Sequence, residues 1–93
     1  MFLHLGGDVV IPFRDVVAIF DMEIGNQSRS TDEFLKVVQE EGFVKDISDG
    51  NPKSFVITNK YVYLSAISSL TLKKRADFLK DFLEKGDQAE IKG

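Results

Sequence analysis

One basic triplet, Lys73-Lys74-Arg75, is the densest group of residues in this sequence that could bind a charged ligand. It falls in the first two turns of a predicted helix, where cations oppose the helix dipole at a cost of roughly a few tenths of a kcal/mol each. A placement that is mildly unfavourable for stability favours a functional role, and contact with phosphate groups is the chemistry that suits it. A solvated helix face whose charges pair with Asp77 and Glu84 is the alternative.

Four more basic residues could extend the triplet into a basic strip. Lys53 and Lys60 lie at opposite ends of one predicted strand, and Arg14 and Arg29 precede it in the chain. Exposed lysines often serve only solubility, and surface ion pairs contribute little to stability. Of the four, Lys53 is the best candidate, so the predicted DNA-binding residues are Lys53, Lys73, Lys74 and Arg75.

Other chemistries have little support in the sequence. His4 is the single histidine, and cysteine is absent, which excludes disulfides and cysteine-based metal sites. Asp8, Asp15 and Asp21 do not follow a calcium-loop pattern, and Gly6-Gly7 lacks the surroundings of a phosphate-binding loop. We therefore expect no enzyme, no metal, no cofactor and no small-molecule substrate.

Length and composition are those of one ordinary globular domain. The chain has 93 residues, of which 43% are hydrophobic and 29% charged, and its net charge is −3. The acidic balance argues against a surface that attracts polyanions everywhere, but it leaves room for a local basic patch. We expect one domain over residues 1–86 with a frayed tail at 87–93, no signal peptide, no membrane span and a cytoplasmic location.

Two adjoining stretches, 54–58 and 61–65, are the part of the chain around which the rest must pack. Both are rich in β-branched and aromatic residues, and Asn59-Lys60 between them predicts a hairpin with Phe55 opposite Leu64 and Ile57 opposite Val62. A longer loop is the alternative. Alternation puts one apolar set on a single face, namely Phe55, Ile57, Val62, Leu64 and Ala66.

The opposite face of this hairpin is half polar and half aromatic. It carries Val56, Tyr61 and Tyr63 together with serine and threonine side chains. A tyrosine offers a large apolar area with a polar end, which suits a subunit interface. A helix that simply covers this face is the equally weighted alternative. The predicted oligomer interface is therefore Val56, Tyr61 and Tyr63.

The remaining segments predict strands and helices in alternating groups. Strands are expected at 1–5, 9–11, 16–20 and 43–47. The strand at 16–20 is expected to be buried on both faces, and a helical turn near Asp15 is the competing interpretation. Residues 22–29 are expected to form a polar linker. A capping box at Ser30 and Glu33 predicts a helix that ends at Gly42, and Ser68 or Ser69 begins a last helix that ends at Gly86. The fold class is α+β, with a small, mostly antiparallel sheet and two helices.

Three stretches resemble a known family. Residues 1–10 and 14–21, which include Leu3-His4-Leu5-Gly6-Gly7 and Val16-Val17-Ala18-Ile19-Phe20, resemble the RemB-type extracellular-matrix regulatory proteins of Gram-positive bacteria. Residues 61–67 resemble the same family and its sister branch, the RemA-type regulators. The resemblance runs from Met1 to about Phe82 and contains no catalytic motif.

This resemblance implies a domain similar to LytTR-type DNA-binding domains, assembly into ring-shaped oligomers, and activation of genes for biofilm matrix. In the RemA branch it implies DNA contact by an arginine pair that follows a loop glycine. Here Gly50 is followed by Asn51 and Pro52, and the branch's other arginine falls at Asp15, so those roles are not carried over.

Together these features predict a non-enzymatic, oligomeric transcriptional regulator of matrix genes that binds DNA through a local basic strip. Its partners are further copies of the chain, in a ring or a dimer, and DNA; a membrane partner is not expected. The alternative is an oligomeric scaffold or protein-interaction module that does not bind DNA, which the acidic net charge favours.

Overall fold

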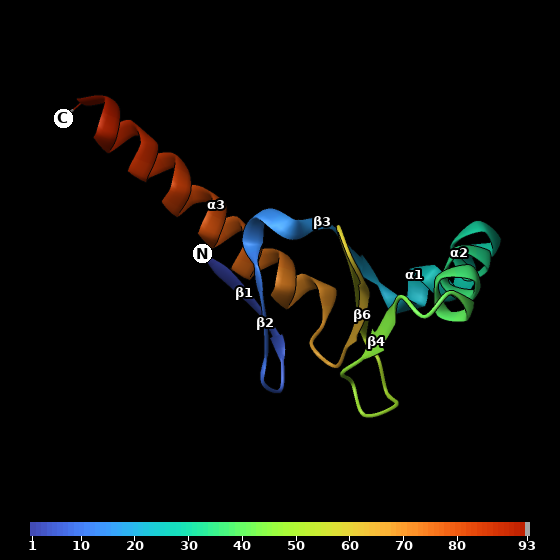
Figure 1. Ribbon diagram of the computed structural model, residues 1–93. Helices are drawn as coiled ribbons and strands as arrows, with labels where there is room; N and C mark the ends of the chain where they lie inside the picture. Colours follow the sequence, from blue (N-terminus) through green and yellow to red (C-terminus); the bar gives the residue numbers. More distant parts are fainter. Residues whose placement is uncertain (93) are drawn as a thin grey trace.

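The computed structural model describes the backbone of residues 1–92 and the side chains of residues 1–24 and 28–85. Figure 1 shows the elements in chain order: β1 (Phe2–Gly6), β2 (Val9–Pro12), a 3-10 turn (Phe13–Asp15), β3 (Val16–Asp21), α1 (Met22–Gln27), α2 (Arg29–Glu40), β4 (Val44–Asp46), β5 (Ser54–Thr58), β6 (Val62–Ser65) and α3 (Ser69–Lys92). The α+β class is confirmed. The described backbone has three α-helices where two were predicted, because α1 occupies the expected linker.

A four-stranded sheet with the order β3-β5-β6-β4 forms the middle of the molecule. The β5–β6 hairpin has the predicted register, with Phe55 opposite Leu64 and Ile57 opposite Val62. β3 pairs with β5 antiparallel, whereas β4 pairs with β6 in parallel, so the sheet is mixed. β1 and β2 form a separate antiparallel pair.

The tight hairpin loop depends on Thr58 rather than on a left-handed residue. Thr58 Oγ1 accepts hydrogen bonds from the backbone N–H groups of Lys60 and Tyr61 and donates to the Tyr61 carbonyl. The Thr58 N–H also donates to that carbonyl, at 2.9 Å. These bonds close the loop without a positive φ at Lys60.

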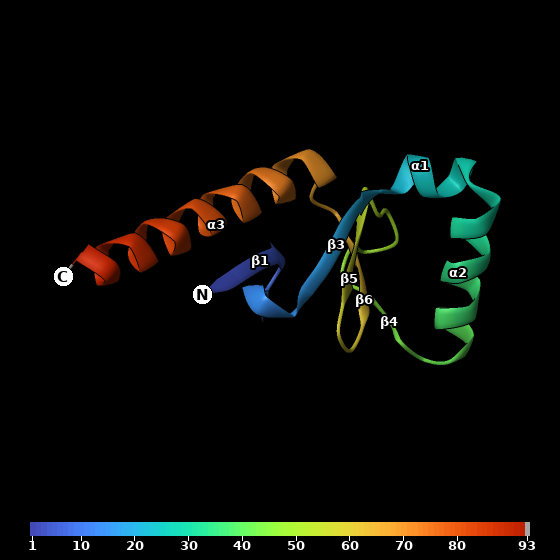
Figure 2. The ribbon, with the colours of Figure 1, turned by 90° about the horizontal axis from the view of Figure 1, so that it is seen from above.

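Figure 2 shows the layers: α3 and the β1–β2 hairpin lie on one side of the sheet, and α1 and α2 lie on the other. The main core is on the α3 side, where the buried residues are Leu3, Leu5, Ile11, Ile19, Val56 and Leu72. The fully apolar face of the central hairpin is therefore not the face that forms this main core. The half-polar face with Val56 and Tyr63 contributes to the main core, and the fully apolar face lies toward α1 and α2.

The apolar face of the hairpin is covered less completely. Phe55 and Val62 are buried, and Phe55 stacks on Phe20 with ring centroids 5.1 Å apart. Phe20 itself stays exposed, as does Val17, so the prediction that this strand is buried on both faces is wrong. Phe20 stays exposed because α2 leaves an apolar hollow of about 230 Å³ between itself and the sheet, which Phe20, Phe34 and Phe55 help to line.

Both longer helices begin at a serine cap. Ser28 Oγ accepts from the Thr31 N–H at the start of α2, so the helix begins earlier than the predicted capping box at Ser30. Gly42 follows α2 with a φ of 82°, as expected for a residue just after a helix end. Ser68 Oγ accepts from the Thr71 N–H and begins α3.

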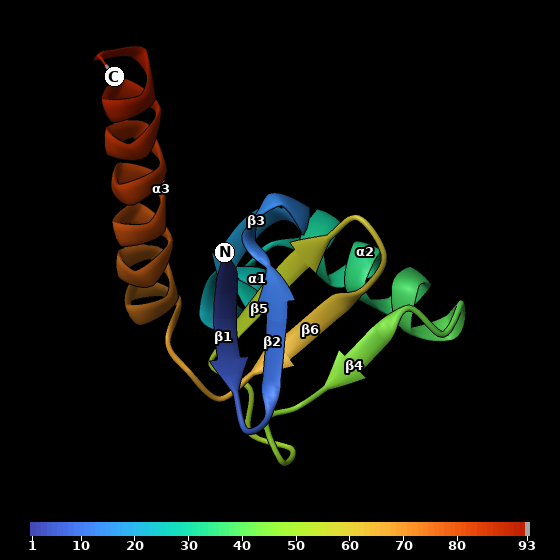
Figure 3. The same ribbon diagram turned by 60° about the vertical axis from the view of Figure 1, so that its left-hand side comes forward.

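α3 is the longest element and projects from the body of the domain (Figure 3). It spans Ser69–Lys92, so the predicted end at Gly86 is wrong. The side chains of residues 86–93 lie outside the described residues, and the predicted fraying of 87–93 stays a prediction. Among the described residues, no helix has the length and apolar character needed to cross a membrane.

Candidate nucleic-acid and subunit interfaces

The basic triplet lies in the second turn of α3, and all three side chains are exposed. Arg75 is held in place, because its Nη1 donates a hydrogen bond of 3.1 Å to the His4 carbonyl of β1. The predicted alternative, in which the triplet pairs with Asp77 and Glu84, is not found among the described side chains, whose ion pairs lie elsewhere. The three cations are therefore open to a partner.

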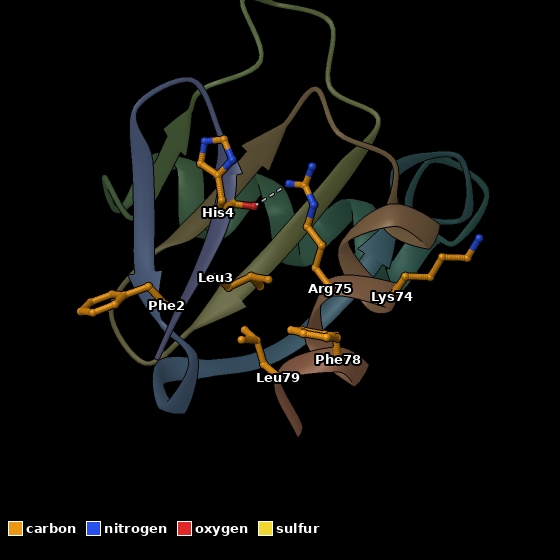
Figure 4. A pocket seen from close by; sticks show the side chains of 7 residues that line it. All are labelled: Phe2, Leu3, His4, Lys74, Arg75, Phe78 and Leu79. Carbon is orange, nitrogen blue, oxygen red and sulfur yellow. Dashed lines mark hydrogen bonds between the residues drawn. The ribbon is translucent and has the colours of Figure 1, made fainter. Parts of the chain in front are cut away.

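Two of the three cations border an apolar groove between α3 and β1, which we call the α3–β1 groove (Figure 4). Its volume is about 400 Å³, and its lining residues are Phe2, Leu3, His4, Lys74, Arg75, Phe78 and Leu79. Lys73 is not among them. The groove therefore combines an apolar floor with the Arg75 guanidinium at its edge, while the Lys74 ammonium points away from the groove into the space beside it (Figure 4).

Lys53 is positioned by its backbone. Its N–H donates to the Ser65 carbonyl at 2.8 Å, and its own carbonyl accepts from the Met22 N–H at 3.0 Å. The exposed side chain borders a hollow of about 420 Å³ that also includes Ser68, just before α3. The structure thus brings Lys53 to the start of the helix that carries the triplet.

The surroundings of Lys53 are not uniformly basic. Asp21 and Glu23 line the same hollow, and the other residues that complete it are uncharged. Two carboxylates beside one ammonium weaken the attraction for a phosphate. Arg14 and Arg29, the other candidates for a basic strip, lie close to Asp15 (3.9 Å) and Glu33 (3.3 Å), respectively.

The loop before β5 begins with a hydrogen-bonded turn at Asp46 and Ser48, which was not predicted from the sequence. Asp46 Oδ1 accepts from both the N–H and the hydroxyl of Ser48, and these hydrogen bonds hold the pKa of Asp46 below its ordinary value. Asp49 and Gly50 follow with φ values of 58° and 83°. An Asp-x-Ser sequence before a glycine is the signal that could have indicated this turn.

The predicted oligomer interface is only partly available. Val56 is fully buried in the core, so its assignment to a subunit interface is wrong: the β1–β2 hairpin and α3 cover this part of the sheet. Tyr61 and Tyr63 are half-buried and lie edge to face, with ring centroids 6.1 Å apart. Lys45, which was not predicted, places its ammonium 4.3 Å from the Tyr61 ring centroid.

The sole histidine has a structural role. His4 Nε2 donates to the Gly7 carbonyl at 2.8 Å, which closes the β1–β2 turn. Within the part of the chain that the structure describes, no group of three or more histidine or acidic side chains could hold a metal ion. The arrangement offers cations and apolar surfaces, which suits binding.

The sequence matches known proteins over most of its length. The family model described as extracellular matrix regulatory protein A-like (RemA-like) matches residues 2–76. Extracellular matrix regulatory protein B of Bacillus subtilis (strain 168) is 47% identical over 79 residues, which cover 85% of this chain and 94% of that protein. The chain therefore belongs to the RemA-like family of extracellular matrix regulatory proteins.

Proposed function

We propose that this chain is a non-enzymatic regulator of biofilm-matrix genes that works in the cytoplasm. The observation that carries the proposal is the family match over residues 2–76, together with a relative named as an extracellular matrix regulatory protein. The binding surfaces described above support a role in recognition rather than catalysis.

DNA contact is the proposed mode of action, through Lys53, Lys73, Lys74 and Arg75. Two features support it: the exposure of these four residues and the place of Lys53 at the start of α3. Lysine and arginine contacts to phosphates position a protein on DNA without reading its sequence. The likeness to LytTR-type domains stays a prediction.

Self-association is the second part of the proposal. One domain has few cations and a net charge of −3, so a single copy would attract DNA weakly. A symmetric oligomer, either a ring or a dimer, repeats the basic strip and multiplies the number of phosphate contacts. Tyr61 and Tyr63 are half-exposed and remain candidates for a subunit contact.

The test is fluorescence anisotropy of a labelled matrix-gene promoter duplex, measured across a series of salt concentrations. We expect binding that weakens as salt rises, since each phosphate contact releases counterions. An unrelated duplex of equal length is the control for sequence preference. No binding at low salt would contradict the DNA-binding part of the proposal.

A scaffold that binds only proteins is the second candidate function. Asp21 and Glu23 beside Lys53 favour it, as does the hydrogen bond that occupies part of the Arg75 guanidinium. A scaffold would leave the anisotropy of the labelled duplex unchanged even at low salt, whereas a DNA-binding regulator would raise it. The anisotropy series therefore separates the two candidates.

A further inference from the structure

α3 carries an apolar ridge that the domain leaves largely uncovered. Phe78, Phe82 and Leu83, which we call the α3 ridge, are exposed to 69%, 57% and 44%. They lie within one and a half turns of the helix, and their neighbour Leu79 packs against the core. A helix whose far end projects from the body has little tertiary packing to stabilise it, so an apolar ridge there needs a partner.

The charges of α3 run against its dipole. Residues 69–80 hold four basic side chains and one acidic one, whereas residues 81–92 hold four acidic and two basic ones. Cations at a helix start and anions at its end are both unfavourable within a single helix. The same distribution becomes favourable when a second α3 lies antiparallel beside the first, because each basic half then meets an acidic half.

The α3–β1 groove lies beside the basic half. Its floor is apolar, and Lys74 and Arg75 border it. The described part of the acidic half presents Phe82 and Leu83 together with Asp81 and Glu84. An apolar ridge with carboxylates next to it matches an apolar groove with cations next to it.

We propose that two copies of this chain associate about a two-fold axis through antiparallel α3 helices. The far end of each α3 lies in the α3–β1 groove of the other copy. This inference rests on the proposed self-association and assigns it a surface. The α3 ridge lies beyond residues 2–76, which the family model matches, whereas most of the residues that line the groove lie within them.

The apolar area available is sufficient for such a pairing. Five exposed apolar residues lie in the groove, on the ridge or in the adjoining hollow that Met1, Phe2 and Leu83 help to line: Met1, Phe2, Phe78, Phe82 and Leu83. Full burial of a phenylalanine covers about 150–250 Å², so covering the exposed fractions in both copies removes roughly 1,000 Å² from water. Specific interfaces begin at about this size.

Sedimentation velocity of the full chain without DNA tests the ridge. We expect a dimer at micromolar concentration, and Phe82→Glu should raise the dissociation constant at least about 100-fold because it buries a charge. Val17→Glu is the matched control, since Val17 is exposed to 67% on β3 and lies outside the groove. Circular dichroism checks that both variants are folded.

Charge reversal tests the antiparallel arrangement. In the variant Lys73→Glu/Lys74→Glu, two acidic halves meet at each contact, and in Asp81→Lys/Glu84→Lys two basic halves meet, so each variant alone should be monomeric. Mixed in equal amounts, the two should form a heterodimer, since every basic segment again meets an acidic one. Single-site ionic contacts elsewhere would not produce this mutual rescue.

Three results would overturn the inference. A monomeric parent at all concentrations contradicts it, and a monomeric parent that binds anionic vesicles through Phe82 would assign the ridge to a lipid surface. A folded Phe82→Glu variant that associates like the parent would leave self-association standing but place it on another surface. Failure of the two charge-reversed variants to associate on mixing would contradict the antiparallel pairing.

Discussion

Ser65→Ala removes a hydroxyl group that joins three parts of the fold. Ser65 is fully buried at the end of β6, and its Oγ donates to the Leu5 carbonyl of β1 at 2.6 Å. The same oxygen accepts from the Ile67 N–H at 3.0 Å, in the segment that leads to α3. The substitution therefore leaves a carbonyl and an N–H group with one partner fewer in the interior.

Each of these two hydrogen bonds contributes about 0.5–1.5 kcal/mol net, so the free energy of unfolding should fall by about 1–3 kcal/mol. That is a large part of the total of about 5–15 kcal/mol expected for a domain of this size. Urea denaturation at equal protomer concentrations measures the difference, since association would also stabilise the folded chain. Ser30→Ala, at an exposed position of α2, is the control and should change stability by less than about 0.5 kcal/mol. A Ser65→Ala effect no larger than that of the control would refute the role given to this hydroxyl.

Three further predictions concern stability and ionisation. Leu5→Ala should lower the free energy of unfolding by about 2–5 kcal/mol in urea denaturation, because Leu5 is fully buried. Leu64→Ala should lower it less, because Leu64 is half-buried. The reverse order would contradict the assignment of the main core to the α3 side of the sheet. The pKa of Asp46 is lowered in the folded state, so its contribution to stability is present above the unfolded pKa of about 3.9 and is lost as the pH falls through the folded value. Ser48→Ala should raise the pKa of Asp46 in an NMR titration, and an unchanged value would refute the hydrogen-bond assignment. Ser68→Ala should lower the free energy of unfolding by about 1 kcal/mol because α3 is left without its cap, and a neutral result in the same assay would place the cap elsewhere.

The sequence was sufficient to predict the central hairpin and its register. Successive side chains of a strand point to opposite faces, so only one pairing of 54–58 with 61–65 keeps the fully apolar set on a single face, and the structure has that pairing. The direction of the core was not predictable in the same way. Ser54 and Ser65 were interpreted as part of a half-polar surface, yet both are buried because their hydroxyls donate to the carbonyls of Ile67 and Leu5.

Contacts between distant parts of the chain account for the other differences. The exposed triplet on α3 was predicted from a local pattern, but the hydrogen bond from Arg75 to the His4 carbonyl joins residues 71 positions apart. Likewise, Val56 was assigned to a subunit interface because nothing in its own strand indicates that the β1–β2 hairpin covers it. Local sequence predicts the elements, whereas these long-range contacts decide which surfaces stay open.

The salt dependence of DNA binding tests the central proposal most directly. Lys53→Ala/Lys73→Ala removes two cations of the proposed strip. Because Lys73 also belongs to the basic half of α3, sedimentation velocity at the assay concentration checks that this variant still self-associates like the parent. Arg29→Ala/Lys36→Ala makes the same change in charge on α2, across the sheet, and is the matched control. We predict that the first variant weakens binding to promoter and unrelated duplexes alike. Its slope of log affinity against log salt should fall by about 0.9 for each phosphate that the variant no longer neutralises, while the control keeps the parent slope. Equal slopes for the parent and both folded variants would contradict DNA contact through this strip.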